Sequence, residues 1–168
     1  MKVITEISRG DLVRFNLAIL PRLKSTYFTM LFIAALAFMW IASDKGMPNT
    51  TIDWLGIIIG SVVGGIAGML AGTLVSFVFI LFSSSKTNGT LGHHEYEIGV
   101  EGLFEKTPVN ESLSKWAGIH EIRVVGPYLV FRISSFLFHI IPKRSFATEQ
   151  EFVAFIDAAR NAWGKQNA

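Results

Sequence analysis

The chain has 168 residues, of which 51% are hydrophobic and only 17% are charged, with a formal net charge of +2. A soluble domain averages about a quarter charged residues, so this composition argues against an ordinary soluble protein. Cysteine is absent, which excludes a disulfide framework, a thiolate nucleophile and a cysteine zinc site. The pI of 9.0 does not indicate nucleic-acid binding, because residues 86–168 hold equal numbers of basic and acidic side chains.

Residues 1–24 are predicted to form an N-terminal interfacial segment. Ser8 is suited to begin a helix, with Asp11 three residues later as the carboxylate of a capping box. Phe15 and Ile19 then share one helical face, so we expect a short helix that lies along the membrane surface. Its simplest role is to anchor the following span, and sensing of the membrane is the alternative.

Two long stretches contain no ionisable residue, one between Lys24 and Asp44 and the other between Asp53 and Lys86. A run of roughly 18 or more apolar residues can cross a bilayer core of about 30 Å. A chain this short has no second layer that could cover two helices apolar on every face. The sequence therefore predicts a transmembrane hairpin over residues 25–85, with spans at about 26–42 and 55–82.

The basic residues flank the first span. Residues 1–24 carry five basic and two acidic side chains, whereas the loop between the spans carries one basic and two acidic side chains. Basic residues beside transmembrane segments are retained on the cytoplasmic side. We therefore predict a multi-pass protein with both its N- and C-termini in the cytoplasm.

The second span carries a small residue at every fourth position. Four residues advance a helix by about 400°, so these positions form one slowly drifting groove. Such a groove lets another helix approach closely within a membrane. The first span is the favoured occupant, and a second copy of the chain or a different membrane protein are the alternatives. No charged residue marks an ion path through this span. The groove residues are Gly56, Gly60, Gly64, Gly68, Gly72 and Ser76.

Residues 86–168 are predicted to form a small α+β domain of short antiparallel strands closed by a C-terminal helix. Thr148 and Glu151 make a capping box for a helix from residue 149 to about 163, whose apolar side chains recur at amphipathic spacing. This outline is that of a pleckstrin-homology-like barrel. The expected strands cover residues 93–98, 102–107, 110–114, 119–125, 128–133 and 136–141.

Several short motifs give the sequence a family resemblance. They are Tyr96-Glu97-Ile98 followed by Gly99 and Gly102, then Trp116 and Ile119, then Ile141-Pro142-Lys143-Arg144-Ser145-Phe146. With the preceding hairpin, they make the chain resemble the YcxB-like family of small bacterial inner-membrane proteins. The resemblance implies an inner-membrane location and a cytoplasmic C-terminal domain. It brings no established activity and therefore no catalytic residues.

We expect no enzymatic activity, no cofactor and no metal site. His93, His94 and Glu95 could be read as metal ligands, but adjacent residues on a strand point to opposite faces and cannot easily share one ion. Lys143 and Arg144 are the best candidates for contact with lipid headgroups or a partner. A solvated turn is the simpler interpretation of that basic pair.

The leading functional hypothesis is a non-enzymatic inner-membrane protein. Its glycine-rich second span would pack against another helix, and its cytoplasmic domain would bind a protein or lipid partner. One alternative is an immunity or inhibitor protein that neutralises a membrane-acting toxin through the glycine groove. The other is an accessory subunit of a transporter or another membrane complex.

Overall fold

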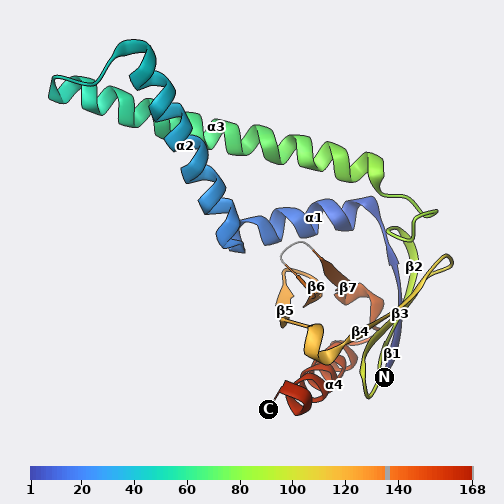
Figure 1. Cartoon of the computed structure of the whole chain (residues 1–168). Coiled ribbons are helices and arrows are strands. Elements are labelled where there is room, and N and C mark those ends of the chain that lie inside the picture. The colour runs from blue at the N-terminus through green and yellow to red at the C-terminus, as the bar shows by residue number, and fades with distance from the viewer. Residues whose placement is uncertain (135–136, 168) are drawn as a thin grey trace. The chain divides into compact units, whose positions relative to one another are not determined.

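The structure is a computed structural model, and it describes residues 1–134 and 137–167. The chain divides into two compact units (Figure 1). The first, called here the β unit, consists of Met1–Ala18 together with Ser83–Ala168, and the second, the helical unit, consists of Ile19–Phe82. The helical unit is thus an insertion between two parts of the β unit.

The β unit contains two antiparallel sheets and a C-terminal helix. The four-stranded sheet has the order β1 (Lys2–Ile7), β2 (Gly92–Ile98), β3 (Gly102–Lys106) and β4 (Glu111–Lys115). The three-stranded sheet has the order β5 (Glu121–Val125), β6 (Tyr128–Arg132) and β7 (Phe138–Pro142). The unit also contains most of α1 (Arg9–Ile19), the short 3-10 helices η2 (Trp116–Gly118) and η3 (Lys143–Ser145), and α4 (Glu149–Asn167).

These elements confirm the coarse prediction of antiparallel strands followed by a C-terminal helix. The last predicted strand is seen as β7 from Phe138, and Phe136 lies outside the described residues. The α4 helix begins as expected, because the backbone N–H of Glu151 donates to Thr148 Oγ1 at 3.2 Å. It buries Phe152, Phe155 and Ala159 against a core that includes the fully buried Trp116, Leu129, Phe131 and Ile141.

Strand β1 was not predicted. It pairs antiparallel with β2, from Lys2 opposite Glu97 to Ile7 opposite Gly92. Val3, Thr5 and Ile7 alternate into the interior and are all buried. The prediction of a separate N-terminal segment at residues 1–24 therefore differs from the structure. These residues instead form a strand, a capped helix and the start of the helical unit. The strand was missed because its pairing partner, β2, lies far along the chain.

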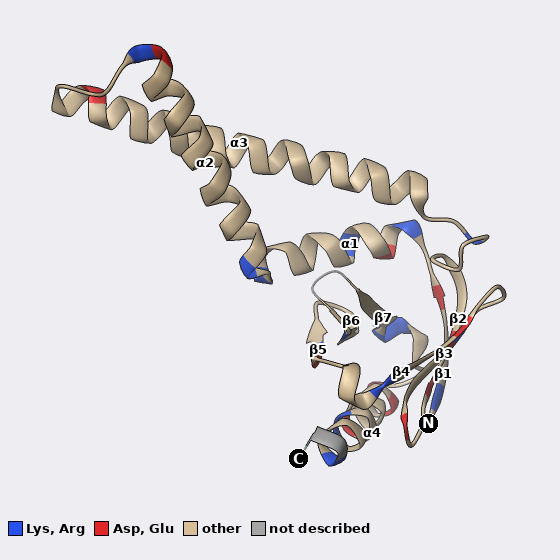
Figure 2. Cartoon of the chain, in the orientation of Figure 1, with Lys and Arg blue, Asp and Glu red and all other residues tan. Residues whose placement is uncertain are grey.

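The helical unit consists of η1 (Leu20–Arg22), α2 (Lys24–Lys45) and α3 (Thr51–Ser83). By length and composition, α2 and α3 are both long and apolar enough to cross a bilayer. Figure 2 shows charged residues near the ends of these helices and none along their middles. A reciprocal capping box begins α3: Asp53 accepts from the backbone N–H of Thr50 at 3.0 Å, and its own N–H donates to Thr50 Oγ1 at 3.2 Å.

The place of β1 in the sheet makes a prediction about the folding of the β unit. Residues 83–168 alone should not fold, because they lack the edge strand whose Val3 and Ile7 are buried. Burial of each such side chain stabilises the folded state by about 1.5–3 kcal/mol. Residues 1–18 joined to residues 83–168 by a flexible Gly/Ser linker should instead show a cooperative thermal transition by circular dichroism. If residues 83–168 melted cooperatively at the same temperature as the linked chain, β1 would be dispensable.

Candidate functional site

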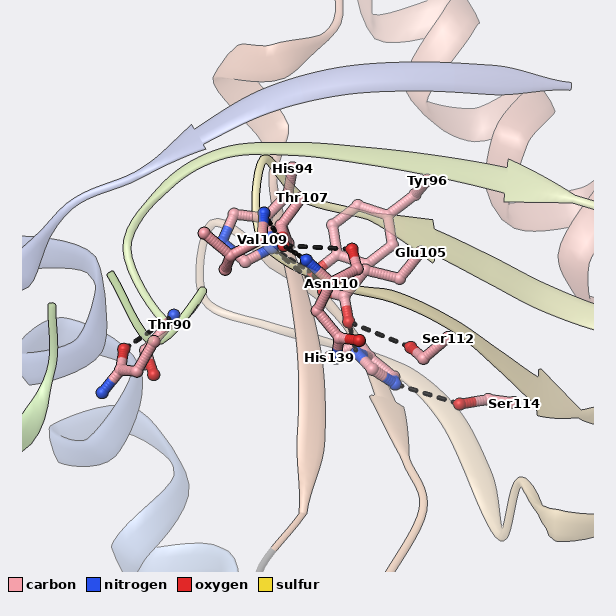
Figure 3. Close-up of polar contacts among 11 residues, drawn as sticks. Thr90, His94, Tyr96, Glu105, Thr107, Val109, Asn110, Ser112, Ser114 and His139 are labelled. Atoms are coloured by element: carbon pink, nitrogen blue, oxygen red, sulfur yellow. Dashed lines mark hydrogen bonds and ion pairs between the residues drawn. The ribbon is translucent and has the colours of Figure 1, made fainter. Parts of the chain in front are cut away.

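A largely buried polar cluster centred on Glu105 joins the two sheets of the β unit (Figure 3). The Oε1 atom of Glu105 accepts from the hydroxyl of Tyr96 at 2.6 Å and lies 3.0 Å from Nδ1 of His94. The Oε2 atom accepts from the hydroxyl of Ser112 at 3.4 Å and lies 3.4 Å from Nδ1 of His139. One carboxylate thus has four polar partners.

The strand register brings these side chains together. In β2, His94 and Tyr96 face the interior, while His93, which precedes them, is exposed. In β3, Glu105 lies opposite Tyr96 on one side and opposite Ser112 of β4 on the other. The fifth member, His139, comes from β7 in the three-stranded sheet. The cluster therefore links residues from both sheets by polar contacts.

The cluster favours an ionised carboxylate despite its burial. Burial raises the pKa of the Glu105 carboxyl, but hydrogen bonds from His139, His94 and Tyr96 outweigh it and hold that pKa well below its usual range. Burial, with the adjacent Glu105 charge, raises the pKa of the Tyr96 phenol well above its usual value. Tyr96 therefore remains a protonated donor at neutral pH.

The two histidines of the cluster differ in how many of their ring nitrogens have a hydrogen-bond partner. His139 Nε2 lies 3.1 Å from the hydroxyl of Ser114. Because a hydroxyl can donate or accept, both ring nitrogens of His139 have a partner in its neutral and its protonated state. In contrast, Nε2 of His94 is buried and has no hydrogen-bond partner among the described residues. An unsatisfied buried polar atom costs about 1–3 kcal/mol.

Ser114, His139 and Glu105 have the order of contacts found in a hydrolase triad. Ser114, however, lies within the extended strand β4 rather than on a sharp turn that would present its hydroxyl to a substrate. The nearby open depression, with a volume of ≈ 270 Å³, is lined by His93, His94 and Thr107 among others but not by Ser114. The geometry therefore fits a polar bridge between sheets better than a catalytic site.

The structure also bears on the metal alternative. His93 and His94 point to opposite faces of β2, one exposed and the other buried. Within residues 1–134 and 137–167, no three potential ligands among His, Cys, Asp and Glu are grouped closely enough to hold a metal ion.

The predicted basic pair is engaged within the β unit. Arg144 donates from Nη1 to Asp11 Oδ1 at 2.6 Å and from Nη2 to Asp11 Oδ2 at 2.7 Å, and its Nη2 also donates to the carbonyl of Glu6 at 2.9 Å. Lys143 forms an ion pair with Glu149. Arg144 thus fastens the start of α1 to η3, and both predicted contact residues already have acidic partners.

Asp11 is the centre of this second polar contact. Its carboxylate accepts from the backbone N–H of Ser8 at 2.9 Å, while its own N–H donates to Ser8 Oγ at 3.3 Å, so the predicted capping box is present. The hydroxyl of Tyr128 also donates to Asp11, at 3.1 Å. Burial raises the pKa of Asp11, but hydrogen bonds from Arg144 and Ser8 outweigh it and hold that pKa well below its usual range.

Within the helical unit, α2 lies against the middle of the glycine groove. A Cβ placed on Gly64 would lie 3.2 Å from Ala37 Cβ, and one placed on Gly68 would lie 2.8 Å from Ile33 Cγ2. On Gly60 it would lie 3.4 Å from Ile41. The outer groove residues Gly56 and Gly72 have no such neighbour within 4 Å, and the Ser76 hydroxyl donates to its own helix, at the carbonyl of Gly72.

A close approach to the backbone of α2 occurs at Gly65, which the four-residue repeat does not include. A Cβ there would lie 2.8 Å from Ala34 Cβ and 2.9 Å from the carbonyl oxygen of Met30. The second of these atoms is backbone, so a side chain cannot be accommodated by a change of rotamer. The crossing of α2 and α3 therefore depends on Gly65 as well as on Gly64 and Gly68.

This difference along the groove gives a matched pair of substitutions. Gly65→Leu should lower the free energy of unfolding of the helical unit in detergent micelles by about 1–3 kcal/mol, and with it the melting temperature. The reason is that overpacking forces the two backbones apart. Gly72→Leu adds the same side chain at an open position and should leave that stability nearly unchanged. Equal effects of the two substitutions on the melting temperature would show that the crossing seen here is not retained in micelles.

The ionised Glu105 predicts a pH dependence of stability. Its pKa is lower in the folded chain than in the unfolded chain, so its stabilisation is present above about pH 4.3 and is lost as the pH falls below that value. Glu105→Gln should therefore flatten the acid side of the stability profile and cost about 2–3 kcal/mol at pH 7.

Urea titration of the full chain in micelles, followed by tryptophan fluorescence between pH 3 and pH 8, would measure this effect. Glu97→Gln is the matched control, because Glu97 is exposed in the neighbouring strand. The prediction fails if the two variants have the same pH profile.

Sequence reasoning missed the Glu105 cluster because its members come from four strands. A local signal was present nonetheless. Glu105 follows the buried Leu103 by two residues, and His94 precedes the buried Tyr96 by two, so both polar side chains occupy inward positions of their strands. Pairing them required the register, which one strand alone does not determine.

Comparison with known proteins gives one match. Residues 98–159 match the family model described as YcxB-like protein. No curated protein and no solved structure matches the chain. The matched segment runs from the end of β2 into α4, and it contains Glu105, His139 and Arg144 as well as the buried Trp116. Over residues 98–159 the chain is therefore similar to the YcxB-like family.

Proposed function

We propose that the chain is a two-span membrane protein that holds its β unit at the bilayer surface. The observation that carries the proposal is the exposure of the apolar side chains of α2 and α3 within the folded chain. Phe28 and Trp40 of α2 are 72% and 73% exposed, and Phe79 and Phe82 of α3 are 70% and 85% exposed. So much contiguous apolar surface requires an apolar surrounding, and a bilayer supplies it.

The pairing of β1 with β2 supports a hairpin rather than a single crossing. Lys2–Ile7 precedes both long helices and Gly92–Ile98 follows them, yet the two strands share one sheet. Two strands of one sheet must lie on the same side of a membrane. The chain between them must therefore cross an even number of times, and α2 and α3 provide two crossings.

The distribution of charge supports a cytoplasmic β unit. Residues 1–24 carry an excess of three positive charges, whereas residues 43–53, around the connection of α2 to α3, have an excess of one negative charge. The resemblance to small bacterial inner-membrane proteins is consistent with this orientation. The proposed location is thus the bacterial inner membrane, with both termini in the cytoplasm.

The β unit supports a role in binding. Its four-stranded and three-stranded antiparallel sheets, followed by α4, support the proposal of a pleckstrin-homology-like domain. Such a domain, tethered beside a membrane, is suited to bind a protein or a lipid headgroup. The proposed role needs no catalytic step, in keeping with the bridging geometry of Ser114, His139 and Glu105.

The two alternatives are a toxin-neutralising immunity protein, which needs a foreign helix in the glycine groove, and an accessory subunit of a membrane complex. The middle of the groove, from Gly60 to Gly68, already faces α2. A foreign helix in this groove would have to displace α2 or bind near Gly56 or Gly72, where an added Cβ would have no neighbour from another element within 4 Å. Both alternatives predict that a second membrane protein co-purifies in defined amount, and a binding role at the bilayer surface does not require one.

The absence of cysteine allows a direct test of the topology. Asn49→Cys lies in the loop between α2 and α3, and Thr87→Cys lies just after α3. In intact spheroplasts, a membrane-impermeant maleimide should label the first variant and should label the second only after lysis. The unsubstituted chain contains no thiol and is the control for background labelling.

The same membranes should retain the protein after washing at alkaline pH, which releases peripheral proteins. Release of the protein would refute membrane spanning altogether. Retention with labelling of Thr87→Cys in intact spheroplasts would leave the two spans in place and reverse the proposed orientation.

A further inference from the structure

Helix α1 has one side fixed in the β unit. Asp11 is buried and holds Arg144, and Phe15 is buried with its ring 5.5 Å from that of Phe138 and 6.2 Å from that of Tyr128. These contacts determine the rotation of the helix about its own axis. The side of α1 that faces away from the β unit is therefore defined by residues outside this interface.

The outward side is apolar in the centre and basic on both flanks. An α-helix turns by about 100° per residue, so Val13 and Leu17 lie about 160° and 200° around the axis from Phe15. Arg9 and Arg14 lie at about 120° and 260°, one on each flank of the apolar pair. Leu17 is 56% exposed, and both arginines are exposed.

We propose that this outward side of α1 binds an anionic lipid surface. Leu17 and Val13 enter the boundary between headgroups and acyl chains, and Arg9 and Arg14 contact lipid phosphates. An apolar stripe flanked by arginines is the pattern of helices that lie in the plane of a membrane. The inference rests on the proposed membrane anchorage and adds to it the lipid class and the residues that recognise it.

Charge and chain length both support a lipid surface as the occupant. Asp11 is the only acidic residue of α1, and its charge is compensated by Arg144, so the exposed charge of the helix is positive. The α1 helix ends at Ile19 and α2 begins at Lys24. Five residue steps reach at most about 18 Å, so the C-terminal end of α1 cannot lie far from the membrane that α2 is proposed to enter.

The test uses the full chain in vesicles, with one cysteine introduced into a sequence that has none. Leu17→Cys carries a fluorescent NBD label, and Asp157→Cys on the exposed side of α4 carries the control label. Vesicles contain either phosphatidylcholine alone or phosphatidylcholine with phosphatidylglycerol. Doxyl lipids report contact with the bilayer, and iodide reports contact with water.

In the anionic vesicles, the label at residue 17 should be quenched by doxyl lipids and protected from iodide, whereas the label at residue 157 should behave in the opposite way. The double variant Arg9→Gln/Arg14→Gln should have a lower ratio of inserted to water-exposed label. The expected reduction is roughly fivefold for each arginine replaced. Arg160→Gln, on the exposed side of α4, is the charge-matched control and should not change that ratio.

Three results would overturn the inference. Equal iodide quenching at residues 17 and 157 would place α1 in water, and protection from both quenchers would show that protein covers it. Equal doxyl quenching in both kinds of vesicle would refute recognition of anionic lipid by Arg9 and Arg14. A chain that fails to float with the vesicles would instead refute the anchorage itself, so the two failures are distinguishable.

Discussion

The pairing of β1 with β2 is the constraint on which the rest of the structure depends. It joins the first residues of the chain to a strand that follows both long helices, and so makes the helical unit an insertion in the β unit. Val3, Thr5 and Ile7 complete the interior face of the four-stranded sheet. The two ends of the insertion are consequently held by one sheet. An anchor attached at only one end would leave its domain free to rotate on a linker, whereas this connection restrains the β unit at two points.

Two carboxylates then link elements of the β unit that lie far apart in the sequence. Glu105 connects strands of both sheets through Tyr96 and His139, and Asp11 connects α1 to η3 through Arg144. Each is a buried or partly buried charge that has several hydrogen-bond partners, which is the condition under which such a charge is tolerated inside a protein. Arg144 lies in the family-matched segment and Asp11 lies outside it. The N-terminal residues therefore complete a polar contact that the matched segment cannot make alone.

Much of the fold was predictable from the sequence because its signals are local. The apolar runs located α2 and α3, and the Ser8–Asp11 and Thr148–Glu151 capping boxes located the starts of α1 and α4. What could not be predicted depends on pairing across long separations. The strand at Lys2–Ile7 is short, and only its register with β2 reveals its place. The four-residue repeat likewise identified Gly64 and Gly68, but the close contact of Gly65 with the α2 backbone depends on how the two helices approach.

The insertion also has a consequence for biosynthesis. A ribosome completes β1 first, then both long helices, and only afterwards β2. The four-stranded sheet therefore cannot form while the helices are being made. The apolar residues of β1 remain without their partner strand until translation has passed Ile98. If the helices enter the bilayer as proposed, sheet closure can follow only when the second of them has returned the chain to its original side. The β unit would then complete its fold only in chains whose two helices have both inserted correctly.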